Sequence, residues 1–200
     1  MRRRPRAPRR PEARAAGRSR DRASRTAAAP PRDRAAADLL ARAARVKLVI
    51  LDVDGVLTDG RIWYGPEGEA LKAFDVKDGH GIVLLRDHVD FGVISGRPGI
   101  AARKRLEELR FKHLVFGQRD KLAGYATLDH LGVEDADVAY MGDDLNDLPL
   151  LRKVGLSACP ADARPEVIDE VRFVSGFPGG RGAVRELCDL IRRAKGLGAA

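Results

Sequence analysis

Apolar runs recur along the chain from residue 46 onward, and each run ends in a polar, turn-rich segment. The run 46–51 (VKLVIL) is nearly continuous and rich in β-branched side chains, which is typical of a strand buried in a parallel sheet. The same pattern predicts four further strands, over 91–94, 111–116, 138–141 and 156–159. Apolar residues at helical spacing predict helices over 79–85, 100–109, 121–128, 148–151 and 184–191. This alternation predicts an α/β domain with a Rossmann-like parallel sheet and helices on both faces.

A different pattern occupies residues 61–75, where apolar and polar positions alternate on either side of the turn segment GPEG. Alternation around such a turn predicts a β-hairpin. The hairpin carries many apolar side chains for two short strands, among them Ile62, Trp63, Tyr64 and Phe74. Because a lone hairpin is marginally stable in water, we expect this one to pair with copies of itself in an oligomer.

Charge divides the chain into two parts. Residues 1–46 hold 15 Lys and Arg against 4 Asp and Glu, a net charge of +11, whereas residues 47–200 hold 22 against 25, a net charge of −3. The first part is mostly Arg, Ala and Pro and has too few apolar residues to offset the entropy of ordering, although 33–45 is helix-friendly. We therefore predict a basic, largely disordered extension over 1–45 and a folded domain over 46–200.

The basic extension has several interpretations at this stage: a solvated tail, a misassigned start, a transit peptide, or an arm for nucleic acid or another anionic surface. Because the folded domain is slightly acidic, nucleic acid is expected to bind through the extension only. The remaining composition excludes other classes of protein. No run approaches the ~18 apolar residues of a membrane span, and the N-terminus lacks the apolar core of a secretory signal.

Cysteine usage agrees with a cytoplasmic protein. The chain has two cysteines, Cys159 and Cys188, which cannot form a disulfide scaffold and are not spaced as a zinc site.

Polar clusters follow the predicted strands at the points where the strands end. In open α/β sheets the functional crevice lies outside the carboxyl ends of the strands, so these clusters should converge there. The residues concerned are Asp52 and Asp54, Ser95 and Arg97, and Asp143, Asp144 and Asp147. Each cluster alone would fit a turn or a helix cap, but their order and placement together point to one site.

Converging carboxylates repel one another unless a cation is present, and a hard divalent cation such as Mg²⁺ takes oxygen ligands of this kind. No His or Cys lies in these clusters, which argues against zinc. Arg97 and Lys121 add positive charge, while Ser95 and the amides around Gly96 can donate hydrogen bonds to phosphate. Carboxylates for a metal and donors for an anion predict metal-assisted phosphoryl transfer, for which aspartate is a known nucleophile.

Four motifs follow one another in residues 46–200: DVDGVLTDG, ISGR, a lysine at a helix start, and GDDLND. They resemble those of the haloacid dehalogenase phosphatase superfamily. Within it, DVDGVLTDGRIWY, FDVKDGHGI and GGRGAVRELCDLI are similar to the 3-deoxy-D-manno-octulosonate 8-phosphate phosphatases. Phosphatases of nonulosonate 9-phosphates share most of this pattern.

The resemblance implies a role for each motif residue. Asp52 would be the nucleophile that forms an aspartyl-phosphate, and Asp54 would protonate the leaving alkoxide and then activate water. Ser95 and Lys121 would hold the phosphoryl group. The implied Mg²⁺ ligands are Asp52, Asp54 through its main-chain carbonyl, and Asp143, supported by Asp144 or Asp147. The implied substrate-binding residues are Asp78, Gly79, Gly96, Arg97 and Arg181.

The function that follows is a Mg²⁺-dependent phosphoric monoester hydrolase in lipopolysaccharide core precursor synthesis. Its expected substrate is a 2-keto-3-deoxy sugar acid phosphate, in first place 3-deoxy-D-manno-octulosonate 8-phosphate. The alternatives are a nonulosonate 9-phosphate or another small phosphate ester, or a non-catalytic regulatory domain of the same fold.

The spacing of the motifs leaves no room for an inserted cap domain, because 40 residues separate Asp54 from Ser95 and 21 separate Lys121 from Asp143. Capless members of the superfamily close their sites with neighbouring subunits, which implies a homotetramer built around the hairpin. The segment 179–182 (GGRG) reads as too flexible to hold itself in place. We therefore expect Arg181 to reach the carboxylate of a neighbour's ligand.

Overall fold

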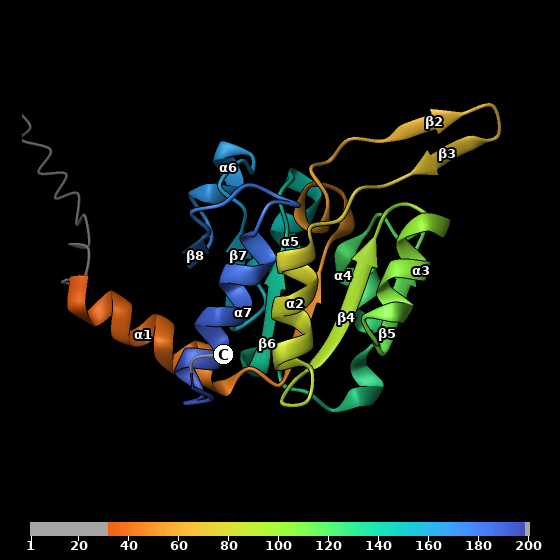
Figure 1. The fold of residues 1–200 in the computed structure, drawn as a ribbon. Helices are drawn as coiled ribbons and strands as arrows, with labels where there is room; N and C mark the ends of the chain where they lie inside the picture. The colour runs from red at the N-terminus through yellow and green to blue at the C-terminus, as the bar shows by residue number, and fades with distance from the viewer. Residues whose placement is uncertain (1–31, 199–200) are drawn as a thin grey trace, which may run out of the picture. The chain divides into compact units, whose positions relative to one another are not determined.

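The computed structural model describes residues 32–198 and contains a six-stranded, wholly parallel sheet (Figure 1). The strand order is β5-β4-β1-β6-β7-β8. The strands are β1 (Leu48–Leu51), β4 (Asp90–Ser95), β5 (His113–Phe116), β6 (Val138–Met141), β7 (Leu156–Cys159) and β8 (Phe173–Val174). The predicted Rossmann-like architecture is thus confirmed. Among the described residues, no helix is both long and apolar enough to cross a membrane.

Helices cover both faces of the sheet, and the alternation of side chains along β1 shows why. Val49 and Leu51 point into one core cluster, with residues of α1, α2, α3 and α7, whereas Leu48 and Ile50 point into the other, with residues of α4, α5 and α6. Both faces need apolar side chains, so the strand reads as a continuous apolar run. The helices are α1 (Arg32–Arg45), α2 (Val76–Leu85), α3 (Ile100–Glu108), α4 (Lys121–Ala126), α5 (Leu148–Leu151), α6 (Pro165–Ile168) and α7 (Ala183–Ala194).

Helix α1 packs on the domain that the sequence predicted to begin at residue 46. Ala43 is fully buried in the core cluster with α7, and the Arg45 guanidinium lies 2.8 Å from a carboxylate oxygen of Asp137. The packed unit therefore includes the helix-friendly stretch before β1. The prediction of disorder for residues 1–31 falls outside the described residues.

The predicted hairpin is present as β2 (Trp63–Gly65) and β3 (Gly68–Leu71), which pair antiparallel and extend away from the sheet (Figure 1). Trp63, Tyr64 and Leu71 are 62%, 69% and 65% exposed. An apolar surface of this kind on two short strands is unusual for a region in permanent contact with water.

Two short elements, β8 and α6, escaped prediction. Strand β8 has two residues and α6 a single turn, so neither is long enough for periodicity to show. The predicted strand at 111–116 starts two residues late, because Phe111 packs its ring against Phe91 in the connection from α3. Arg110 in that connection has φ +62°, the left-handed conformation in which helices usually end on glycine.

Candidate functional site

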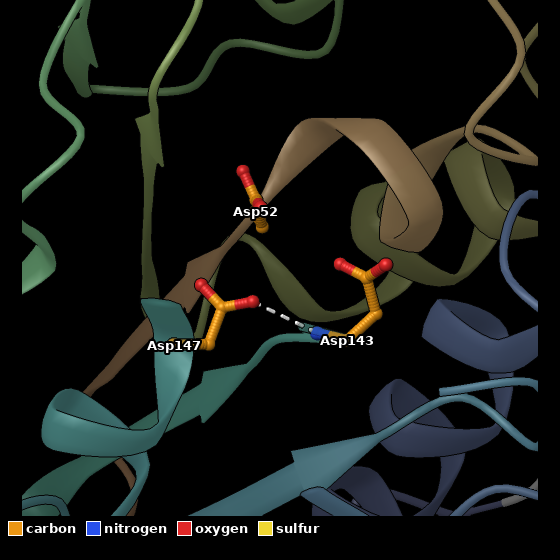
Figure 2. A group of neighbouring side chains, drawn as sticks. All are labelled: Asp52, Asp143 and Asp147. Atoms are coloured by element: carbon orange, nitrogen blue, oxygen red, sulfur yellow. Dashed lines mark hydrogen bonds between the residues drawn. The ribbon is translucent and has the colours of Figure 1, made fainter. Parts of the chain in front are cut away.

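Three carboxylates meet where β1 and β6 end (Figure 2). Asp52 follows β1 directly, Asp143 lies two residues beyond β6, and Asp147 ends the short helix η4 (Leu145–Asp147). Each offers one oxygen within 4.8 Å of the others. The neighbouring strands are tied together at this edge, since the amide of Asp52 donates to the Met141 carbonyl at 3.0 Å. The convergence predicted from the sequence therefore occurs for these residues.

The turn η1 (Val53–Leu57) after β1 makes room for Asp143. It is one wide turn, closed by a 3.0 Å hydrogen bond from the Thr58 amide to the Val53 carbonyl. Gly55 within it has φ +90°, and a Cβ built there would lie 2.0 Å from an oxygen of Asp143. Glycine is required on both counts, because a side chain would be strained and would displace the carboxylate.

Lys121 is the positive charge of the cluster. Its side chain is fully buried at the start of α4, with Nζ 2.9 Å from Asp52, 3.1 Å from Asp147 and 2.9 Å from the Ile94 carbonyl. Burial alone would lower the pKa of Lys121, but the two carboxylates outweigh it, so the pKa is raised and the lysine stays charged.

Asp147 holds the neighbouring residues in place, because its two carboxylate oxygens accept hydrogen bonds from several of them. One oxygen accepts from the Tyr140 hydroxyl at 2.6 Å, and the other accepts from the amides of Asp143 and Asp144 at 2.9 and 3.1 Å. Asp144 itself is exposed to solvent and accepts from the Leu145 amide at 2.7 Å. Of the two acids that the sequence left open, Asp147 is thus the one built into the cluster.

Asp143 and Asp52 carry the excess negative charge. Burial, then the charges of Asp147 and Asp52, raise the pKa of Asp143 to about 8. Burial also raises the pKa of Asp52 to about 6, against the opposing effect of Lys121. One oxygen of Asp143 is buried and makes no hydrogen bond. Three carboxylates with one ammonium leave a net negative charge that a divalent cation would neutralise.

Asp54 lies apart from this trio and faces two cations. Its carboxylate forms an ion pair with Lys72, and the Arg97 Nε lies 3.7 Å away. The Lys72 side chain is fully buried and also lies 3.4 Å from Glu69. Sequence reasoning missed Lys72, because it sits at the end of the hairpin and no motif marks it.

The loops after β4 and before α4 form the mouth of the site. The Ser95 hydroxyl accepts from the Arg97 amide at 3.3 Å, and the Gln118 amide donates to the Ser95 carbonyl at 3.0 Å. Above them lies a hollow of about 680 Å³. It is lined by Gly96, Arg97, Pro98, Arg119, Asp144, Leu145 and Asn146. Arg119 is a second residue that sequence reasoning did not single out.

Two residues expected to bind substrate, Asp78 and Gly79, make packing contacts within the chain. Asp78 is buried and accepts from the amides of Gly182 at 3.2 Å and Arg185 at 2.7 Å, so it caps the N-terminus of α7. Gly79 is buried against α3, where a Cβ would lie 2.5 Å from the Arg105 guanidinium. These contacts join α2 to its neighbouring helices, and the substrate-binding role expected of the two residues stays a prediction.

The segment 179–182 is also held more firmly than the sequence suggested. Gly179 donates to Asp162 at 2.9 Å, and Gly180 donates to the Val56 carbonyl at 2.9 Å. A Cβ on Gly179 would lie 1.8 Å from the Gly55 carbonyl oxygen, so the glycines allow the segment to pack on η1. The expected flexibility is therefore wrong. The Arg181 side chain is 62% exposed, and its nearest carboxylate, Asp59, is 3.9 Å away.

Comparisons with known proteins agree with this site. A family model described as haloacid dehalogenase-like hydrolase matches residues 117–185. The chain is 46% identical over 162 residues to the 3-deoxy-D-manno-octulosonate 8-phosphate phosphatase of Escherichia coli, covering 80% of this chain and 86% of that protein.

Solved structures show the same likeness. The crystal structure of the corresponding phosphatase from Yersinia pestis is 46% identical, with a TM-score of 0.77, covering 80% of this chain and 87% of that chain. The enzyme from Moraxella catarrhalis, solved with a magnesium ion, a phosphate ion and a KDO molecule, is 37% identical with a TM-score of 0.76. That match covers 80% of this chain and 92% of the other.

Proposed function

The chain belongs to the haloacid dehalogenase-like hydrolase family, and on this premise we propose that it hydrolyses 3-deoxy-D-manno-octulosonate 8-phosphate with Mg²⁺. The observation that carries the proposal is the buried Asp52, which is paired with Lys121 and lies in one cluster with Asp143, a residue with a buried, unpartnered oxygen. The relatives named as this phosphatase support the substrate, and the magnesium in the Moraxella catarrhalis complex supports the cofactor.

The residues present fit a magnesium ion. Asp52 and Asp143 supply carboxylate oxygens close together, and the buried oxygen of Asp143 has no other partner. The resemblance to the superfamily adds the main-chain carbonyl of Asp54 as a third ligand. The ion supplies charge neutralisation for the phosphate dianion and polarises the phosphoryl oxygens. Asp147 has its oxygens committed to other donors, so we assign it to orienting Lys121 and the loop that holds Asp143.

The hydrogen bonds of Asp52 leave one oxygen free for attack. Both the Val53 amide, at 2.7 Å, and the Lys121 ammonium, at 2.9 Å, contact the same oxygen, Oδ1. Oδ2 can therefore form the bond to phosphorus while the ester P–O bond breaks and the sugar leaves as an alcohol. Ser95 and Lys121 hold the phosphoryl group in line.

Asp54 moves the protons. It protonates the leaving oxygen in the first half of the reaction, and in the second half it takes a proton from the water that attacks the aspartyl-phosphate. This second step releases phosphate and restores the Asp52 carboxylate. The Asp54 carboxylate lies near Lys72 and Arg97, outside the cluster of Asp52, Asp143 and Asp147, which supports separate roles for the two acids of DVD.

We further propose that the enzyme is a cytoplasmic homotetramer in which the hairpin β2–β3 meets its copies and closes the site. The exposed Trp63, Tyr64 and Leu71 support this assembly, and so does the absence of an inserted cap in the described residues. Light scattering of wild type and of Trp63→Lys tests it. We expect a tetramer for wild type and a smaller species for the variant, whereas a fully active wild-type monomer would rule the assembly out.

A phosphate-release panel tests the catalytic proposal. The panel contains 3-deoxy-D-manno-octulosonate 8-phosphate, a nonulosonate 9-phosphate and a neutral sugar phosphate, each assayed with Mg²⁺ and with EDTA. We expect the octulosonate ester to have the highest kcat/KM, and we expect no turnover in EDTA or with Asp52→Asn. Turnover at the wild-type rate in either condition contradicts the mechanism, and preference for another ester contradicts the substrate.

A further inference from the structure

The cationic side chains around the site differ in whether a carboxylate of the protein already lies beside them. Lys121 is paired with Asp52 and Asp147, and Lys72 with Asp54 and Glu69. Arg97 lies 3.7 Å from Asp54. Within the part of the chain that the structure describes, Arg119 is the cation lining the mouth that has no carboxylate within 4 Å. It is exposed to solvent and therefore available to an anionic ligand.

The backbone of Arg119 is anchored on both sides. The preceding residue, Gln118, donates its amide to the Ser95 carbonyl at 3.0 Å. The following residue, Asp120, caps α4 by accepting from Leu122 at 3.0 Å and Ala123 at 3.1 Å. Lys121 then begins the helix and points into the acidic trio. One short segment thus places an ammonium inside the site and a guanidinium at its mouth.

The Arg119 side chain packs beside Gly96. A Cβ built on Gly96 would lie 3.4 Å from Cγ of Arg119, so the arginine stem packs over the loop that follows β4. Ser95 is the last residue of β4 and immediately precedes that loop, and we assign its hydroxyl to the phosphoryl group. Arg119 therefore lines, with Gly96 and Arg97, a hollow of about 680 Å³ next to the loop that follows Ser95.

The proposed substrate has two anionic groups, and Mg²⁺, Ser95 and Lys121 would hold its phosphate. The carboxylate of the sugar acid needs a partner of its own, and an arginine fork binds a carboxylate through two parallel hydrogen bonds. We propose that Arg119 binds this carboxylate and is the residue that selects sugar acid phosphates over neutral sugar phosphates. This inference rests on the proposed function.

Steady-state kinetics of the full chain tests the assignment with Arg119→Gln, Arg119→Lys and the control Arg103→Gln. Arg103 stacks on the Phe116 ring at 4.9 Å and does not line the hollow. With Arg119→Gln we expect KM for the octulosonate ester to rise about 10- to 100-fold, the usual effect of losing a charge-assisted hydrogen bond. We expect kcat to stay within threefold, and KM for arabinose 5-phosphate and p-nitrophenyl phosphate to stay within twofold. Arg119→Lys keeps the charge without the fork and should fall between wild type and Arg119→Gln.

Product inhibition gives a second readout that does not depend on turnover of the sugar acid ester. The free sugar acid should inhibit p-nitrophenyl phosphate hydrolysis about 10-fold less well with Arg119→Gln, while inhibition by inorganic phosphate should not change. Equal KM and inhibition constants in wild type and Arg119→Gln overturn the inference. An equal loss on all three esters also overturns it, since Arg119 would then act on the phosphate or the fold. If wild type fails to hydrolyse the octulosonate ester, the proposed function fails instead.

Discussion

Replacing Gly55 with alanine should displace the Asp143 carboxylate through a steric clash. A control variant can separate this effect from ordinary backbone strain. Gly55 has φ +90°, and a left-handed conformation costs a residue with a side chain about 1–2 kcal/mol. The new Cβ would also lie 2.0 Å from an oxygen of Asp143, and overpacking of this kind costs about 1–3 kcal/mol. The total loss in free energy of unfolding is therefore about 2–5 kcal/mol.

Gly132→Ala is the matched control. Gly132 has φ +62°, and nothing lies within 4 Å of its Cβ position, so alanine there carries the strain without the clash. The two variants are compared by urea unfolding and by Mg²⁺ titration of phosphatase activity. We expect both to lose stability, but only Gly55→Ala should need at least 10-fold more Mg²⁺ for half-maximal activity, because it displaces Asp143. Equal Mg²⁺ requirements in the two variants would refute the link between Gly55 and the metal ligand.

Three further predictions concern catalysis, stability and pH. Asp54→Asn should lower kcat by roughly 10²–10⁴-fold, and an unchanged kcat would disprove its role as the acid and base. Arg110→Gly should raise the free energy of unfolding by about 1 kcal/mol, because it removes a side chain from φ +62°; chemical denaturation that shows no gain would contradict this. In EDTA the protein should be more stable at pH 6 than at pH 8. The folded-state pKa of Asp143, about 8, exceeds the ordinary value of 3.8, so the unfolded chain ionises first and stability falls as pH rises toward 8. The pKa of Asp52, about 6, acts in the same direction only below about pH 6, so the loss between pH 6 and pH 8 comes from Asp143. Thermal melts that are flat between pH 6 and pH 8 without metal, or unaffected by added Mg²⁺ at pH 8, would speak against a strained acidic cluster.

The sequence alone was sufficient for five of the six strands and for the motif residues at their carboxyl ends. Strand β1 is buried on both faces, so it reads as a continuous apolar run, a pattern typical of a central parallel strand. Asp52 and Ser95 stand at the ends of such strands, and parallel strands bring their carboxyl ends to one edge. The position of these residues therefore follows from local pattern and general topology.

The tertiary structure decided every assignment that depends on which loops touch. Asp144 and Asp147 are equivalent as sequence, but only Asp147 turns inward to Tyr140 and Lys121. Asp78 lies in a segment that resembles a substrate loop, and it caps a helix more than a hundred residues away. Contacts of this kind arise when separate segments pack, so no local pattern carries them.

The residues missed at the mouth were missed for the same physical reason. Lys72 becomes a partner of Asp54 because the hairpin returns beside η1, and Arg119 becomes a lining residue because its segment packs beside Gly96 in the loop after β4. Lysine and arginine on loops are most often solvated, so their sequence context gives no reason to select them. The spacing of apolar residues indicates which face of a single helix or strand is buried. Which charged side chains face a ligand depends on how several elements pack together.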